Sequence, residues 1–173
     1  MAIDRSEIHK ALGSFATGVT VITTRVGGRF YGLTANSFTS VSLAPPVLLF
    51  CIGRSRHSYG AFAVTCTFTV NVLNSMQSDL SDRFATSGDD KWRELLYVED
   101  DLGNAMFPDS VAVFSCAKRQ TIESGDHLIV LGEVLGFRQN AVLDPLVYCR
   151  GQYCVPAAMP PASPNQLRMS AVY

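Results

Sequence analysis

The sequence predicts a mainly β protein, a closed or nearly closed barrel with a few α-helices at its ends. Three observations lead to this fold class. Short runs of β-branched and aromatic residues recur along the chain, Gly- or Pro-containing turn signals separate them, and few segments have helical spacing. At 173 residues, of which 47% are hydrophobic and 17% charged, the chain fits one domain with a sizeable buried core.

The chain opens with a predicted amphipathic helix over residues 4–15. Asp4 followed by Glu7 has the spacing of a capping box, and Gly18 ends the element. One face of this helix carries the apolar residues Ile8, Ala11, Leu12 and Phe15. The helix should therefore bury that face against something apolar.

Strands follow this helix. Residues 19–24 are mostly β-branched, Gly27-Gly28 supplies the positive φ angles of a tight hairpin turn, and a return strand runs through 30–33. The apolar run 47–52 reads as a buried strand. Further strands are predicted at 68–73, 111–122, 128–137, 146–148 and 152–154.

Two shorter helices and two irregular segments complete the prediction. The helices are expected at 55–64 and at 75–85, the second with Ser75 near its cap, and residues 86–109 read as a loop. Four of the eight prolines lie beyond Val155. We therefore expect a domain over 1–154 and an extended arm or mobile tail over 155–173.

The composition argues against several classes of protein. The chain has 14 Lys and Arg against 15 Asp and Glu, a net charge of −1, so no broad basic surface for nucleic acid is expected. Its longest apolar stretch, 44–52, is far shorter than the ~20 residues that span a membrane. The charged N-terminus does not resemble a signal peptide, and we expect a cytoplasmic protein.

The cysteines and histidines predict neither disulfides nor a metal centre. The number of cysteines, five, is odd, and they form no C-x-x-C pair, which is typical of reduced core residues. A zinc site needs clustered ligands, whereas His9, His57 and His127 are far apart in the sequence. A Cys51–His57 pair is a conceivable nucleophile, but a core cysteine explains Cys51 more simply.

Phosphate-loop and dinucleotide motifs are absent from the sequence, but three other segments suit a polar ligand. Residues 34–42 carry hydroxyl, amide and backbone groups that suit a planar heterocycle and a phosphate, or simply close a barrel. Residues 53–58 combine two arginines, a histidine and two serines before a helix, as an anion site or a solvated loop. His127 lies in a turn between two long strands, where a functional role competes with a structural one.

Several ordered motifs resemble those of the short-chain flavin reductases, the reductase components of two-component flavin-dependent monooxygenases. The resemblance runs over residues 8–154 and begins with Phe15-Ala16-Thr17-Gly18-Val19-Thr20-Val21-Ile22-Thr23-Thr24. The main flavin motif of the family resembles Gly32-Leu33-Thr34-Ala35-Asn36-Ser37-Phe38-Thr39-Ser40-Val41-Ser42-Leu43, followed by Pro45-Pro46. Later matches are Phe68-Thr69-Val70-Asn71-Val72-Leu73 with Gln77, Leu80 and Arg83-Phe84, then Gly125-Asp126-His127, then Arg150-Gly151-x-Tyr153.

The resemblance implies an FMN-binding split β-barrel of Greek-key type with a few flanking helices. It implies a homodimer that transfers hydride from NADH or NADPH to FMN or FAD and supplies reduced flavin to an oxygenase component. The alternatives are a flavoprotein of this fold that reduces a non-flavin acceptor, and a non-catalytic flavin binder.

The resemblance also assigns site residues. The flavin would contact Gly32, Leu33, Thr34, Asn36 and Ser37, and then Cys51, Ile52 and Gly53. His57 and Ser58 would lie near the phosphate and Arg83 near the charged end of the flavin. The nicotinamide nucleotide would meet His127, as its positioning residue, and Tyr148, Cys149, Arg150 and Gly151.

Overall fold

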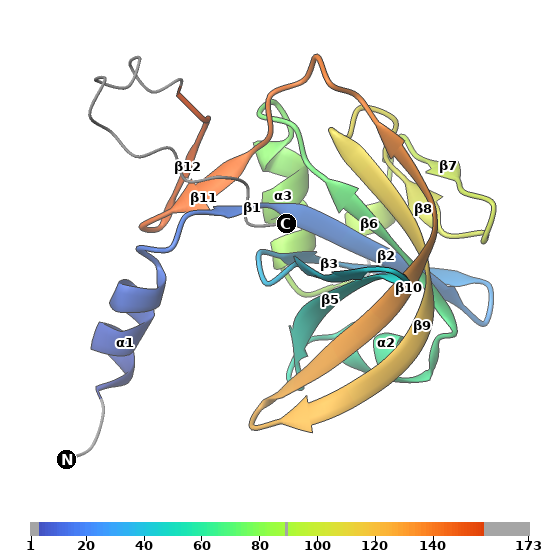
Figure 1. Cartoon of the computed structure of the whole chain (residues 1–173), viewed down its shortest axis with the longest axis horizontal. Coiled ribbons are helices and arrows are strands. Elements are labelled where there is room, and N and C mark those ends of the chain that lie inside the picture. The colour runs from blue at the N-terminus through green and yellow to red at the C-terminus, as the bar shows by residue number, and fades with distance from the viewer. Residues whose placement is uncertain (1–3, 89, 158–173) are drawn as a thin grey trace.

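A seven-stranded antiparallel sheet forms the body of the protein in the computed structural model, which describes residues 4–88 and 90–157 (Figure 1). The strand order is β3-β2-β6-β9-β10-β5-β4. The strands are β2 (Thr20–Val26), β3 (Arg29–Ala35), β4 (Thr39–Leu43), β5 (Pro46–Gly53), β6 (Thr67–Val72), β9 (Ala112–Ser124) and β10 (His127–Gln139). The sheet curls without hydrogen-bonded closure, and β3 and β4 are its edges, so the mainly β split-barrel prediction is confirmed.

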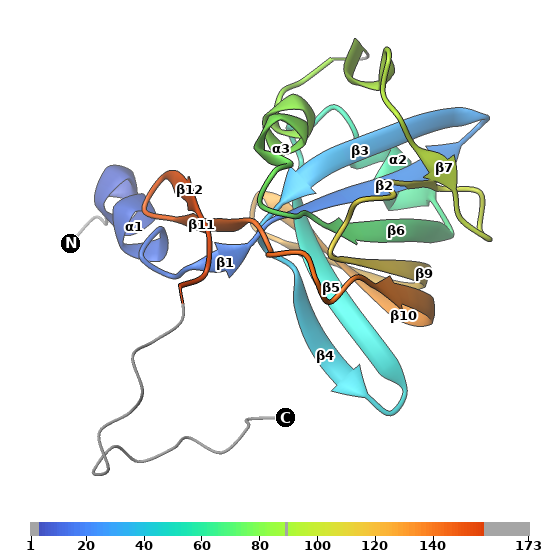
Figure 2. The ribbon, with the colours of Figure 1, turned by 90° about the horizontal axis from the view of Figure 1, so that it is seen from above.

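Two smaller sheets and the helices surround this body. A three-stranded sheet has the order β1 (Thr17–Gly18), β11 (Val147–Cys149) and β12 (Gln152–Cys154), and β7 (Val98–Glu99) pairs with β8 (Ala105–Met106). The helices are α1 (Arg5–Leu12), α2 (Tyr59–Val64), α3 (Ser78–Ala85) and the 3-10 turn η1 (Asp90–Trp92). Figure 2 shows α1, β1, β11 and β12 standing together to one side of the body.

The core has two parts because β2 is buried on both faces. Ile22 packs into the larger cluster inside the curled sheet, together with Phe50, Phe62 and Phe68. Its neighbour Val21 points the other way and joins the second cluster, which α3 closes with Phe84. The period of two in strand side chains thus places one residue of β2 in each core.

The hairpin and strand predictions agree with the structure. Gly27 and Gly28 have φ angles of +58° and +79°, the left-handed conformation that the tight β2–β3 turn requires. The strands at 111–122 and 128–137 are β9 and β10, and those at 146–148 and 152–154 are β11 and β12. The stretch 86–109 is mostly loop but also contains η1, β7 and β8.

The helix predictions need correction at their ends. The first helix stops at Leu12 with Gly13 as its C-cap, so it does not reach Phe15 and Gly18 does not end it. Asp4 caps α1 as predicted, accepting a hydrogen bond from the Ser6 N–H at 2.8 Å. The second helix begins only at Tyr59, because consecutive turns occupy the residues before it. The third begins at Ser78, and Ser75 is not its cap, because the Asn74 and Gln77 side chains bind the backbone N–H groups of Met76 and Asn74 instead.

The prediction that the cysteines are core residues is wrong for most of them. Cys116 is fully buried, and burial raises the pKa of its thiol to about 12. Cys51 and Cys149 are half-buried, whereas Cys66 and Cys154 are exposed. All five are free thiols, as expected from their irregular spacing.

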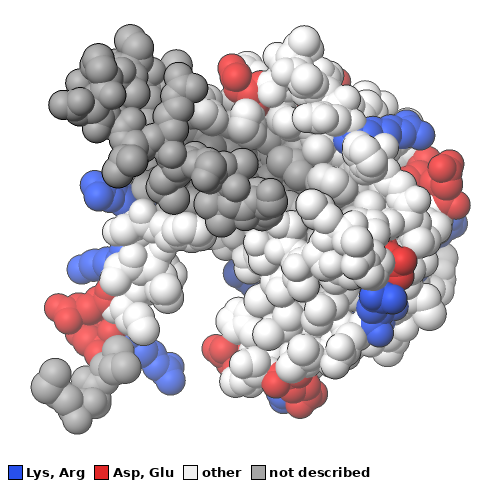
Figure 3. Space-filling model, viewed as in Figure 1, with Lys and Arg blue, Asp and Glu red and all other residues white. Residues whose placement is uncertain are grey.

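The described residues include no helix long and apolar enough to cross a membrane. Lys, Arg, Asp and Glu are interspersed on the face shown in Figure 3, with no large patch of one sign on its described surface. The predicted tail from residue 158 onward lies outside the described residues.

Candidate functional site

A groove follows the edge strand β3, whose outer backbone N–H and C=O groups pair with no other described strand. At the end of this strand lies a cavity of about 400 Å³. Figure 2 shows α3 lying beside this end of β3. The residues that line the cavity come from β3, α3 and the β11–β12 hairpin and include Thr34, Asn36, Ser81, Asp82, Tyr148, Gly151 and Tyr153.

The groove continues from this cavity toward a cationic end. A narrower pocket shares Thr34, Arg56 and Ala85 with the first cavity and adds His57, Ser58 and Lys91. Beyond it, a cavity of about 290 Å³ is lined by Arg83, Thr86, Ser87, Gly88, Asp90 and Lys91. The shape and charge suit an elongated ligand with a ring at one end and phosphate at the other.

Three hydroxyls assigned to the flavin by resemblance are hydrogen-bonded within the protein. Thr34 Oγ1 donates to the Ser81 carbonyl at 2.5 Å, which ties β3 to α3. Ser37 Oγ accepts from the Cys51 N–H at 2.9 Å. Ser58 Oγ donates to the Gly32 carbonyl at 3.4 Å. These side chains fix the walls of the groove, and their contacts with a flavin stay predictions that would use the remaining oxygen lone pairs.

His127 pairs directly with Gly53 of β5, three residues before Arg56, which lines the groove. A Cβ atom on Gly53 would lie 3.5 Å from His127 Nε2 and 3.8 Å from Arg56 Cγ. The missing side chain therefore leaves open the space between the imidazole and the arginine. The other ring nitrogen, Nδ1, lies 2.7 Å from Asp126 Oδ1, and this hydrogen bond lowers the pKa of the aspartate.

The other residues assigned by resemblance have mixed positions. Leu33 and Ile52 belong to the core, and Leu33 also lines the narrower pocket of the groove. Arg83 donates to the Arg93 carbonyl and so holds the loop that follows α3. Arg150 is exposed, and its backbone N–H bonds the Gly13 carbonyl at 2.7 Å.

Tyr148 and Cys149 lie on β11, and Gly151 follows in the turn. Tyr148 and Gly151 line the first cavity, and Cys149 is half-buried beside them on the strand. Asn36 is exposed at the same cavity. The structure therefore brings the flavin motif and the β11–β12 hairpin to one cavity, although 112 residues separate Asn36 from Tyr148.

The sequence placed Arg56 only within the candidate anion site at 53–58, and Tyr153 only within a matching family motif. Arg56 lines both adjoining cavities, and its Nη1 donates to the Ala85 carbonyl at 3.0 Å. The Tyr153 hydroxyl bonds Ser81 Oγ at 2.8 Å and Asp82 Oδ1 at 2.6 Å, and burial raises its pKa. The cluster at 53–58 was the signal for Arg56, and the Arg150-Gly151-x-Tyr153 match was the signal for Tyr153.

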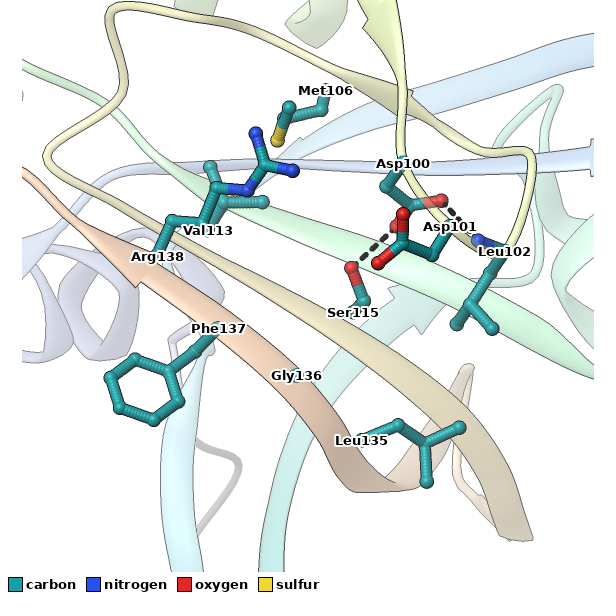
Figure 4. Close-up of a pocket in the computed structure, with 10 residues that line it drawn as sticks. All are labelled: Asp100, Asp101, Leu102, Met106, Val113, Ser115, Leu135, Gly136, Phe137 and Arg138. Atoms are coloured by element: carbon teal, nitrogen blue, oxygen red, sulfur yellow. Dashed lines mark hydrogen bonds between the residues drawn. The ribbon is translucent and has the colours of Figure 1, made fainter.

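A separate cavity of about 190 Å³ lies on the β9–β10 side, next to Asp100 (Figure 4). Asp100 accepts hydrogen bonds from Ser115 Oγ at 2.6 Å, from two backbone N–H groups at 3.0 Å and from the Thr69 hydroxyl. Its carboxylate is therefore saturated and holds the loop in place. The described residues contain no cluster of three or more His, Cys, Asp or Glu that suits a metal ion.

The open β-sheet structure with cavities along the edge strand β3 defines a mainly β protein with a candidate ligand site, and comparison with known proteins specifies the family. Residues 12–157 match the flavin reductase like domain. The chain therefore belongs to the flavin reductase like family.

Individual relatives agree with this assignment. A Rhizobium meliloti protein named "Probable flavin reductase" is 39% identical over 174 residues, covering 98% of this chain and 56% of the relative. The reductase component of a flavin-dependent trigonelline monooxygenase from Acinetobacter baylyi is 40% identical, covering 87% of this chain and 49% of that protein. The chain thus spans about half the length of these two curated relatives.

A solved structure matches over nearly its whole length. It is the Streptomyces globisporus NADH:FAD oxidoreductase SgcE6 in complex with NAD and FAD fragments. The TM-score is 0.84 at 33% identity, with 92% of this chain and 96% of that chain covered.

Proposed function

We propose that this protein is an NAD(P)H-dependent flavin reductase that transfers hydride from NADH to FMN or FAD. The observation that carries the proposal is the run of adjoining cavities lined by Thr34, Arg56, His57 and Ser58, with His127 Nε2 next to Gly53. Family membership and the names of the relatives support the same activity.

Bound flavin would accept the hydride, and that chemistry belongs to the two cofactors. The protein has to hold the two rings with reacting atoms about 3–3.5 Å apart. In this proposal the backbone of β3 and Gly53 hold the flavin ring, and Arg56, His57 and Ser58 hold its phosphate. His127 positions the nicotinamide, with Asp126 fixing the imidazole through Nδ1.

We further propose that the flavin is a substrate that leaves after reduction and serves an oxygenase component. The hydroxyls of Thr34, Ser37 and Ser58 are engaged within the protein, which favours weak and reversible binding of the flavin. The name of the Acinetobacter baylyi relative, a monooxygenase reductase component, supports such a partner. A protein that stays yellow through dilution and desalting would contradict this proposal and favour a prosthetic flavin.

The active form in this proposal is a homodimer. The eight-residue helix α1 buries none of its residues, and Leu12 and Phe15 near its end are 69% and 77% exposed. Helices this short are marginally stable in water without packing. A second copy of the chain is the proposed cover for the apolar face of α1.

The deciding experiment is NADH oxidation without oxygen, with and without added FMN or FAD. Rapid oxidation that requires free flavin, with bleaching of that flavin, is the expected result. Flavin binding without oxidation of NADH or NADPH would favour a binding protein, and turnover only with another acceptor would favour the alternative flavoprotein.

A further inference from the structure

The groove has a branch that the flavin ring and its first phosphate do not use. A cavity of about 390 Å³ shares His57 with the groove and lies between β3 and α2. It is lined by Val26, Arg29, Tyr31, His57, Gly60, Ala61 and Val64. Because side chains alternate along a strand, Tyr31 lies on the same face of β3 as Leu33, which is in the core cluster with Phe62 of α2. Thr34 lies on the opposite face, where it bonds α3. The branch therefore crosses the edge of β3.

The lining of this branch suits a flat aromatic ring. Tyr31 supplies an aromatic face, with the Arg29 guanidinium 6.0 Å from its centroid. Val64 is 68% exposed beside it, and no atom lies within 4 Å of the position that a Cβ on Gly60 would occupy. Apolar walls, open space and a cation next to an aromatic ring form a stacking surface for a nucleobase.

The other branch, next to Arg83 and Lys91, has a different character. Among the residues that the structure describes, its lining consists of charged and hydroxyl side chains with one glycine and includes no aromatic or aliphatic side chain. Such a lining suits phosphate and not a base. Of the two branches, only the one at Tyr31 combines a stacking surface with direct continuity to His57.

We propose that the preferred flavin is the dinucleotide FAD, with its pyrophosphate at Arg56 and His57 and its adenosine stacked on Tyr31. This inference rests on the proposed function, because it names the substrate of the same groove. FMN, which lacks the adenosine, would fill the groove but leave the branch at Tyr31 empty.

Equilibrium binding followed by flavin fluorescence tests the inference independently of turnover. The wild-type protein should bind FAD roughly five- to 100-fold more tightly than FMN, the range expected for one stacked base. Tyr31→Ala should lose most of this difference while FMN binding changes less than about twofold, and Tyr31→Phe should keep it because the ring remains. Equal affinity for both flavins in the wild type, or an equal loss for both in Tyr31→Ala, would overturn the inference.

A second variant guards against a folding effect at the half-buried Tyr31. Val64→Asp replaces an apolar wall of the branch with a carboxylate and should weaken binding of FAD about fivefold or more relative to FMN, because the adenine would stack beside a charged group. Val142→Asp is the matched control, because Val142 is 89% exposed and lines none of the cavities described above. An unchanged FAD-to-FMN ratio in Val64→Asp would count against the inference. NADH oxidation with FMN tests the proposed function separately, since FMN turnover does not need the branch.

Discussion

In the proposed function, His127 positions the nicotinamide and does not act on the flavin. Replacing His127 with Ala should raise the KM for NADH about five- to tenfold, as expected for one lost hydrogen bond, and leave the KM for flavin within about twofold. The side chain is half exposed, so the fold should be unaffected. Steady-state kinetics with each substrate varied in turn measures both constants.

The control for this variant is Arg119→Ala, which removes an exposed ion pair with Glu133 on the same β9–β10 hairpin. It should leave both constants at their wild-type values, because surface ion pairs contribute little. A change in the flavin KM alone in His127→Ala would show that the imidazole belongs to the flavin site.

Cys116 makes stability depend on pH in the alkaline range. Burial, with the nearby Asp100 charge as a smaller cause, raises the pKa of this thiol from 9.0 to about 12. Between these two values the unfolded chain holds fewer protons than the folded one, so the free energy of unfolding falls as pH rises, by up to about 1.4 kcal/mol per pH unit. The stabilisation that the raised pKa of Cys116 gives is present in full below pH 9 and is lost as the pH rises above 9.

The prediction is tested by urea unfolding at pH 8 and pH 10. Cys116→Ala should be less stable than wild type at pH 8 because it leaves a cavity, and the gap should narrow by about 1 kcal/mol at pH 10. Cys66→Ala removes an exposed thiol and serves as the control, with the wild-type pH dependence. An equal gap at both pH values would mean that the Cys116 thiol ionises as readily in the folded protein as in the unfolded chain.

Features that depend on neighbouring residues could be predicted from the sequence, but contacts between residues far apart in the sequence could not. The Gly27-Gly28 turn and the Asp4 cap depend on neighbouring residues, and both are present in the structure. The Thr34 hydroxyl instead bonds a carbonyl 47 residues away, at Ser81. From the sequence alone, this internal hydrogen bond of Thr34 could not be distinguished from a contact with a ligand, because the packing of α3 against β3 was unknown.

At the scale of elements, the spacing between β3 and α3 sets the width of the groove. A Cβ on Gly32 would lie 2.5 Å from Cε1 and 2.8 Å from Cδ1 of the buried Phe84 ring. Gly32→Ala should push α3 away from β3, lower the free energy of unfolding by about 1–3 kcal/mol and raise the KM for flavin. Denaturant unfolding and steady-state kinetics check the two effects.

Gly136→Ala is the matched control for this substitution, because no atom lies within 4 Å of the added methyl group on β10. Gly136→Ala should change the free energy of unfolding and the KM for flavin much less than Gly32→Ala does. Wild-type stability in Gly32→Ala would mean that Phe84 moves aside freely and that the contact does not fix the groove.

Strand periodicity predicted the elements better than helix signals did. Alternation or continuous burial marks β2, β5, β6, β9 and β10, and each is present close to its predicted range. The start of a helix depends on which side chains bind the free backbone N–H groups around it. Before α3, the side chains of Asn74 and Gln77 bind backbone N–H groups of a turn, and the helix begins after that turn. The site was predicted from family motifs, because periodicity alone does not show that β3 and β11 reach one cavity.

At the scale of the whole molecule, the described residues leave the amphipathic helix α1 without apolar cover. The sequence predicts an apolar face on this helix, but its residues Ile8, Leu12 and Phe15 are all exposed in a single copy of the chain. Burying a side chain such as Leu or Phe stabilises a protein by about 1.5–3 kcal/mol, so a partner that covers this face gains several kcal/mol. A second copy provides that cover under the proposed homodimer.

The double substitution Leu12→Asp and Phe15→Asp tests the homodimer, because two carboxylates on the apolar face cannot be buried without a large desolvation cost. The wild-type chain should sediment at about twice its mass of 18.8 kDa, and the variant as a monomer at the same protein concentration. Met76→Asp alters a comparably exposed apolar residue away from α1 and should remain dimeric. A dimeric double variant would place the interface elsewhere on the molecule, and a monomeric wild type would remove the homodimer from the proposed function. Since no residue of α1 is buried within one copy, dissociation should also reduce its helicity, which amide hydrogen exchange across residues 5–12 would report as lost protection.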